Sequence, residues 1–124
     1  SIFPEENGID IAYFFDKDIE RAENIASLAG GVAVLNFEDM LDDVDLILIV
    51  GDKNSNNTRK LLDTAKRHHP NKQSILVGSF LELRRDFIKN KNHIVIASGA
   101  STPKYIIDAV VSFINQMTTF GIFS

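Results

Sequence analysis

The stretch V-D-L-I-L-I-V-G-D-K-N-S-N-N-T-R-K, residues 44–60, decides the fold of this chain. Its five apolar residues 46–50 form a short continuous run, which is typical of a strand buried on both faces of a parallel sheet. Gly51 ends the strand, and the polar residues 52–57 lead into a helical pattern that begins near Thr58. The first turn of a helix has backbone N–H groups without intrahelical partners, so this loop is a candidate anion-binding site.

Four other apolar runs alternate with helical patterns on either side of this stretch. The predicted strands are 9–15, 32–37, 46–50, 74–77 and 93–97. The predicted helices are 19–28, 58–68, 81–89 and a last one from Pro103 to about residue 116, with a short helix or turn at 38–43. We leave residues 1–8 as a lead-in and 117–124 as a tail of undecided structure. Strands that alternate with helices predict a single three-layer α/β domain over residues 1–124, with a mostly parallel sheet of about five strands and helices on both faces.

The composition excludes several classes of protein. With 124 residues, 44% of them hydrophobic, the chain can bury a core of its own. The apolar runs are too short for a membrane span, and a net charge of −4 without a Lys/Arg cluster argues against nucleic-acid binding. We therefore expect a cytoplasmic protein without a membrane or nucleic-acid partner. The chain has no cysteine, so it can form no disulfide and supply no thiolate to a metal or an iron–sulfur cluster.

Polar residues follow three of the predicted strands, at residues 51–57, 78–79 and 98–102. In an open parallel sheet, ligands bind outside the carboxyl ends of the strands. A phosphate or diphosphate needs several neutral donors in a fixed cup, which hydroxyl, amide and backbone N–H groups supply. The residues expected to face one such crevice are Ser55, Asn57, Ser101 and Thr102, with Lys53, Arg59 and Lys104 as the nearby cations.

Simpler explanations exist for these residues and for the other polar groups. Ser and Thr ahead of a helix are preferred N-caps, each contributing about 1 kcal/mol of stability. Asp16 or Asp18 is a candidate cap for the first helix, and Asp16 is also placed to bind a ribose hydroxyl. The adjacent histidines His68 and His69 lie where a helix ends and suit its last carbonyl groups. No nucleophile and base are recognisable as a pair.

Two segments resemble a known family. Residues 51–61, G-D-K-N-S-N-N-T-R-K-L, look like the G-x-K-N-S-x-N-T-x-x-L signature of the hydroxymethylbutenyl diphosphate reductases, the LytB/IspH family of isoprenoid synthesis. Residues 98–107, S-G-A-S-T-P-K-Y-I-I, are similar to its A-G-A-S-T-P-x-x-I-I segment. The resemblance covers about residues 44–114, whereas the first 40 residues fit only as a preceding βαβ unit.

The resemblance implies a ligand and the residues that hold it. In that family, Ser and Asn side chains of these two loops hold the diphosphate of the substrate. Carried over to this chain, the contacts fall on Ser55, Asn57 and Ser101, with Asn56 and Thr102 as further candidates. Asn56 departs from the pattern, because the family commonly has Ser or another small residue there.

The resemblance also implies a cofactor that this sequence does not support. The family's reaction uses a 4Fe-4S cluster held by three cysteines, and the chain has none. The family's proton-relay His and Glu residues belong to preceding domains. We therefore predict a C-terminal part of a divergent family member, inactive as a reductase alone and dependent on the rest of a parent chain.

Two rival functions remain open on the sequence. One is a fragment of a nicotinamide-dependent dehydrogenase, in which residues 9–50 are strands of a dinucleotide-binding domain and Asp16 holds the ribose. Against it, the chain contains no G-x-G-x-x-G fingerprint. The other is a non-catalytic interaction module, supported by the apolar residues Phe120, Ile122 and Phe123 of the tail.

Overall fold

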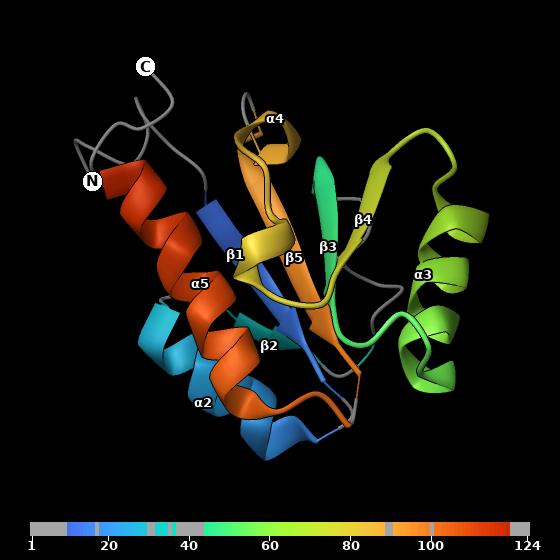
Figure 1. The fold of residues 1–124 in the computed structure, drawn as a ribbon, viewed down its shortest axis with the longest axis horizontal. Coiled ribbons are helices and arrows are strands. Elements are labelled where there is room, and N and C mark those ends of the chain that lie inside the picture. The colour runs from blue at the N-terminus through green and yellow to red at the C-terminus, as the bar shows by residue number, and fades with distance from the viewer. Residues whose placement is uncertain are drawn as a thin grey trace.

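The centre of the structure, a computed structural model, is one parallel sheet of five strands in the order β2-β1-β5-β3-β4 (Figure 1). The structure describes residues 10–16, 18–29, 32–34, 36, 44–88, 91–99 and 101–119. The strands are β1 (Asp10–Phe15), β2 (Val32–Val34), β3 (Leu46–Val50), β4 (Gln73–Val77) and β5 (His93–Ser98). The sheet confirms the α/β class predicted from the alternating pattern.

Helices cover both faces of this sheet and complete three layers (Figure 1). One face packs against α3, and the other packs against α2 and α5 together with the segment between β4 and β5. The helical elements are α2 (Ile19–Ala29), α3 (Asn56–His68), the 3₁₀ turn η2 (Phe80–Glu82), α4 (Arg85–Ile88) and α5 (Lys104–Thr119). Within the described ranges, no helix has the length and apolar character needed to cross a bilayer.

Strand β3 explains why the sheet needs both layers. Leu46, Leu48 and Val50 belong to the core under α2 and α5, whereas Ile47 and Ile49 belong to the core under α3. All five side chains are fully buried, as the continuous apolar run predicts. Burial of each contributes about 1.5–3 kcal/mol, so this strand alone fixes the position of the sheet between its two helical layers.

The pairing of β3 with β5 determines where the two polar loops lie. These strands are direct neighbours in the sheet, although β4 lies between them in the sequence. Their register pairs Val50 with Ser98, the last residue of each strand. The loops that follow, 51–55 and 99–103, therefore leave the same edge of the sheet side by side.

One predicted helix is wrong. The single helix expected at 81–89 is instead η2 followed by the short α4, with extended backbone between them at Leu83. The Ser79 hydroxyl accepts a hydrogen bond from the Leu81 N–H at 3.2 Å, which favours a tight turn over a full helix. The extended conformation buries Leu83 while Leu81 stays exposed. A local hydrogen bond and one buried side chain thus override the helical spacing.

The other differences concern the ends of elements. Helix α3 begins two residues before the predicted Thr58, and α5 continues through residues 117–119, which we had assigned to the tail. The predicted lead-in 1–8, the turn at 38–43 and the apolar tail residues 120–124 lie outside the described residues.

Candidate anion-binding site

Two glycines allow the loops after β3 and β5 to approach each other. Gly51 follows β3 and Gly99 follows β5, and the Gly99 N–H donates to the Val50 carbonyl at 3.4 Å. A Cβ added at Gly51 would lie 2.5 Å from Thr58 Oγ1, and one added at Gly99 would lie 2.6 Å from the same atom. Neither space admits a side chain. The two glycines therefore close around Thr58, which belongs to the first turn of α3.

Thr58 is the residue that our sequence reasoning missed as part of the site. The sequence predicts only that Thr58 starts a helix, but its side chain is fully buried between the two loops. Its hydroxyl oxygen has no hydrogen-bond partner within the described part of the chain. The signal was present, because the G-x-K-N-S-x-N-T pattern specifies this position as well as the preceding Ser and Asn.

The first loop is a compact turn held by Asp52. The Asp52 carboxylate accepts from the Asn54 N–H at 2.8 Å, and its carbonyl accepts from the Ser55 N–H at 2.9 Å. The turn delivers Ser55 to the N-cap position of α3 with extended backbone angles, φ −78° and ψ 130°. Unlike an ordinary cap, the Ser55 side chain makes no hydrogen bond to the helix. Its hydroxyl is therefore available to a ligand.

The second loop is held by Thr102. The Thr102 N–H donates to the Gly99 carbonyl at 2.9 Å, and the Thr102 hydroxyl donates to the Val50 carbonyl at 3.2 Å. Thr102 is buried, whereas its neighbour Ser101 is exposed. Because the Thr102 hydroxyl already donates within the protein, it has no proton to offer an anion. Thr102 connects the second loop to β3 and leaves Ser101 at the surface.

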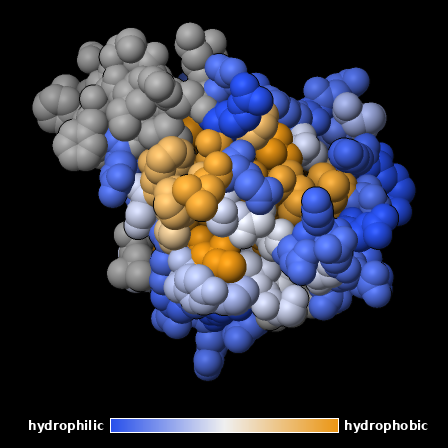
Figure 2. Space-filling view, viewed as in Figure 1, coloured by the Kyte–Doolittle hydropathy of each residue, from blue (hydrophilic) through white to orange (hydrophobic). Residues whose placement is uncertain are grey.

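Both loops line one cleft of about 920 Å³ at the carboxyl edge of the sheet. Its lining includes the polar residues Ser55, Ser101, Lys53 and Asp52, and the apolar residues Leu76 and Ile106. A cleft lined by both polar and apolar groups suits a ligand that combines a polar group with a hydrocarbon part. In the surface view, apolar and polar groups adjoin over the middle of the face that carries η2 and α5 (Figure 2).

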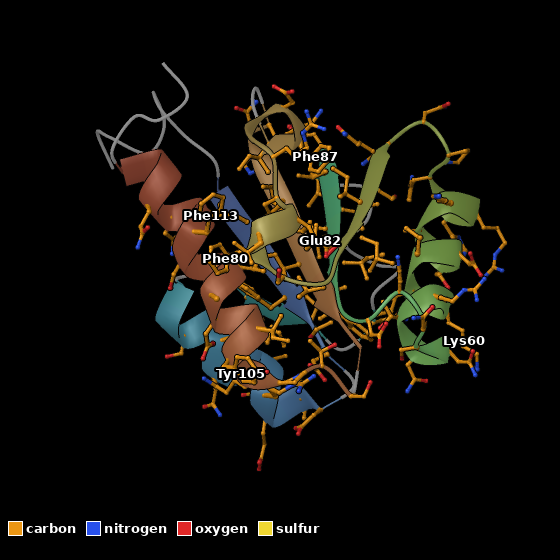
Figure 3. All side chains as sticks on the ribbon, in the orientation of Figure 1. Lys60, Phe80, Glu82, Phe87, Tyr105 and Phe113 are labelled. Carbon is orange, nitrogen blue, oxygen red and sulfur yellow. The ribbon has the colours of Figure 1, made fainter. Side chains whose placement is uncertain are left out.

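A carboxylate occupies the third strand end. Gly78 follows β4, and its N–H donates to the Glu82 carboxylate at 2.9 Å. Glu82 lies on η2 between α5 and the carboxyl half of β3 in the stick view, and it lines the same cleft (Figure 3). The cleft lining therefore carries two carboxylates, Glu82 and Asp52, beside the ammonium group of Lys53.

The remaining predicted contacts lie apart from the cleft wall. Asn56 is exposed and Asn57 half-buried in the first turn of α3, and neither lines the cleft. Lys104 pairs with Asp108 at 2.8 Å on the surface of α5, and Arg59 is exposed on α3. The structure thus brings Ser55, Ser101, Thr102 and Lys53 together and leaves the two asparagines beside them.

Asp16 has a different role from the one expected. The N-cap of α2 is Asp18, whose carboxylate accepts from the Arg21 N–H at 3.3 Å. The buried Asp16 carboxylate accepts from the Asp18 N–H at 2.9 Å through one oxygen. Its other oxygen accepts from Arg21 Nε and from the Ser98 hydroxyl, both at 2.6 Å. Both oxygens are thus engaged within the protein, which leaves Asp16 unsuited to hold a ribose.

The donor set of the chain does not fit the iron–sulfur cluster that the resemblance implies. The sequence contains no cysteine, and the described residues contain no group of three or more His, Asp or Glu that could hold a metal ion. Cluster irons are held by thiolates, with histidine replacing some of them in one class. We therefore assign no redox step to this chain.

Fold and cleft together define an α/β domain with a ligand cleft at the carboxyl edge of a parallel sheet, built from two strand-to-helix loops. A sequence model of the family described as LytB protein matches residues 34–115, well over half of the chain. The chain belongs to the LytB protein family.

Curated relatives agree with this assignment. The chain is 43% identical over 72 residues to a 4-hydroxy-3-methylbut-2-enyl diphosphate reductase of Helicobacter pylori. This aligned stretch covers 58% of this chain and 26% of the relative. It is 36% identical over 73 residues to the reductase of the same name from Nautilia profundicola, 59% of this chain and 25% of the relative. The chain thus spans about a quarter of the length of the relatives it matches.

Solved structures agree with the fold. A structure of (E)-4-hydroxy-3-methyl-but-2-enyl diphosphate reductase superposes with a TM-score of 0.59 and 25% identity, covering 86% of this chain and 44% of the other. The reductase structure from Plasmodium falciparum gives a TM-score of 0.55 at 17% identity, covering 94% of this chain and 54% of the other. The second likeness concerns the fold alone.

Proposed function

We propose that this domain binds the diphosphate group of a small prenyl-type molecule in the cleft between residues 51–55 and 99–103. The observation that carries the proposal is the unused hydroxyl of Ser55, which occupies an N-cap position without capping the helix. It lines the same cleft as Ser101 and Lys53. Hydroxyl donors beside a helix N-terminus and one ammonium group match the needs of a diphosphate. The relatives' names supply the prenyl diphosphate class.

The residues that line the cleft support one orientation of the ligand. The diphosphate contacts Ser55, Ser101 and Lys53, and the hydrocarbon part lies along Leu76 and Ile106. Of the other candidates, Thr102 holds the second loop through its hydrogen bonds. Asn56 and Asn57 lie in the first turn of α3, beside the diphosphate. Since one lysine is the main cation, we expect weak affinity for a bare pyrophosphate, with a Kd on the order of 0.1–1 mM.

Reduction is not part of the function that we propose for this chain alone. The reductase reaction of the relatives needs a redox centre, and this sequence supplies no thiolate for one. Any reductive step would depend on cysteines supplied from outside these 124 residues. The domain's own contribution is to bind and orient the anionic end of the substrate.

The proposal is tested by titrating inorganic pyrophosphate into ¹⁵N-labelled protein and following amide shifts by NMR. We expect saturable shifts at the Ser55 and Ser101 amides. Ser55→Ala should weaken binding about tenfold or more, because it removes a hydrogen bond to a charged group. The same variant should barely change stability, since Ser55 makes no cap hydrogen bond. Absence of shifts at both amides up to millimolar pyrophosphate would exclude the proposed site.

Ser79→Ala is the matched control. Ser79 also follows a strand and a glycine, but its hydroxyl accepts from the Leu81 N–H. Removing it should lower the free energy of unfolding by about 1 kcal/mol and leave pyrophosphate affinity unchanged. The two serines should therefore show opposite effects. If Ser55→Ala behaves like Ser79→Ala, Ser55 is an ordinary cap.

A further inference from the structure

One arginine connects the first helix of the domain to both ends of the second loop. Arg21 lies in the first turn of α2, and its Nη2 donates to the Gly99 carbonyl at 2.9 Å. Its Nη1 donates to the Thr102 carbonyl. These two residues bound the segment that carries Ser101. A single guanidinium therefore holds the segment at both of its ends, about 80 residues away in the sequence.

The guanidinium of Arg21 is held in turn by the buried carboxylate of Asp16. Asp16 Oδ2 accepts from Arg21 Nε at 2.6 Å, and the Asp16 side chain is 1% exposed. The same oxygen accepts from the Ser98 hydroxyl, and Ser98 is the residue directly before Gly99. The rigid, planar fork of arginine matches this arrangement, because its donors point in fixed directions from one group. Asp16 and Ser98 thus fix where the fork points.

The contacts have an electrostatic effect on the cleft. Carbonyl oxygens carry partial negative charge and repel an anion. Arg21 engages the carbonyls of Gly99 and Thr102, so these oxygens are directed to the guanidinium. Among the residues described as lining the cleft, Arg21 does not appear. Any effect of Arg21 on the cleft would therefore pass through the loop.

We propose that Arg21, anchored by Asp16, is a positioning residue that holds the loop 99–102 in its ligand-binding conformation. The proposal rests on the proposed diphosphate-binding function. Arg21 and Asp16 lie outside the family match, which covers residues 34–115, whereas the loop that they contact lies within it. A buried ion pair is weak evidence of a contribution to stability, since its desolvation cost offsets much of its attraction. The guanidinium of Arg21 donates to two carbonyls of the loop, so its role is to hold the loop in place.

The test uses Arg21→Lys, which keeps the charge beside Asp16 but cannot reach both carbonyls with one ammonium group. Hydrogen exchange at the Thr102 N–H, which donates to the Gly99 carbonyl, reports the order of the loop without any ligand. We expect exchange there to rise about tenfold and pyrophosphate affinity to fall about five- to tenfold. Arg67→Lys, on the exposed last turn of α3, is the matched control and should change neither quantity.

Each outcome decides the proposal. Unchanged exchange at Thr102 in Arg21→Lys overturns it, and so does faster exchange with unchanged affinity, which would make Arg21 purely structural. If the unsubstituted protein binds no pyrophosphate, the proposed function fails and the positioning role fails with it. The exchange rates would then still show whether Arg21 orders the loop. Should Arg21→Lys fold poorly, Asp16→Asn removes the anchor at constant size and should give the same paired changes.

Discussion

Gly99→Ala should destabilise the domain because its added Cβ would clash with a single atom, Thr58 Oγ1. The added Cβ would lie 2.6 Å from Thr58 Oγ1, about 0.8 Å inside the 3.4 Å at which ordinary contact begins. Its other close neighbours, Thr102 Oγ1 and Thr58 N, lie at 3.5 Å and need not move. Thr58 is fully buried in the first turn of α3, so its side chain cannot swing into solvent. The clash is thus confined to a single hydroxyl.

The magnitude follows from two opposing terms. Overpacking of a buried site costs about 1–3 kcal/mol. The φ angle of Gly99 lies outside the left-handed range, so alanine fits the backbone and gains about 0.4–1 kcal/mol from reduced freedom of the unfolded chain. We therefore expect a net loss of about 1–2 kcal/mol, or about 4–8 °C in Tm.

A double-mutant cycle isolates the cause. Thr58→Ala removes Oγ1, so in that background Gly99→Ala should be neutral or stabilise by a few tenths of a kcal/mol. The assay is urea unfolding followed by circular dichroism, with m-values compared across the four proteins. Gly78→Ala is the control, because its one short contact is with the end of the exposed Glu82 side chain. Because the added Cβ displaces the carboxylate that accepts from the Gly78 N–H, this variant should cost about 0.5–1.5 kcal/mol, equally with Thr or Ala at position 58. An equal cost of Gly99→Ala in both backgrounds would refute the reasoning.

Two further predictions concern the segment where the predicted helix 81–89 is absent, and Asp45, directly before β3. Leu81→Ser should change the free energy of unfolding by less than about 0.5 kcal/mol, because Leu81 is 79% exposed. Leu83→Ala should cost about 2–5 kcal/mol, because Leu83 is buried. Similar costs for both variants would favour a continuous helix. Asp45→Ala should cost about 1–2 kcal/mol, because the Asp45 carboxylate accepts from the N–H groups of Asn92 and His93 at 2.8 and 3.1 Å; urea unfolding measures it, and no loss would show these hydrogen bonds to be dispensable.

The part of the fold visible in the sequence is the part specified locally. The apolar run 46–50, the glycine after it and the polar loop each indicate their own structure, and β3 and α3 lie close to their predicted positions. The prediction of a helix at 81–89 was wrong because the structure there is not specified by the apolar spacing alone. The spacing suits a helix, but the local hydrogen bond of Ser79 favours a tight turn, and the burial of Leu83 depends on packing against the sheet.

The sequence predicted that the two loops face one crevice, but it did not specify the strand pairing that brings them together. Both loops were recognisable, and Ser55 and Ser101 do line one cleft. Their adjacency depends on β5 pairing with β3, and local propensity contains no information on strand order. The contacts of Arg21 with the second loop and the closure of two glycines on Thr58 arise from residues distant in the sequence. No single-sequence pattern specifies such contacts.

The central position of β5 has a consequence for how the strands assemble into one sheet. β5 is the last strand in the chain order, yet it lies between β1 and β3, which have no pairing with each other. Without β5, the other strands can pair only as β1 with β2 and β3 with β4, and each pair leaves the edge that β5 occupies unpaired. Only the arrival of β5 joins them, and the same event brings the two loops together. Assembly of the cleft and closure of the sheet are therefore one step.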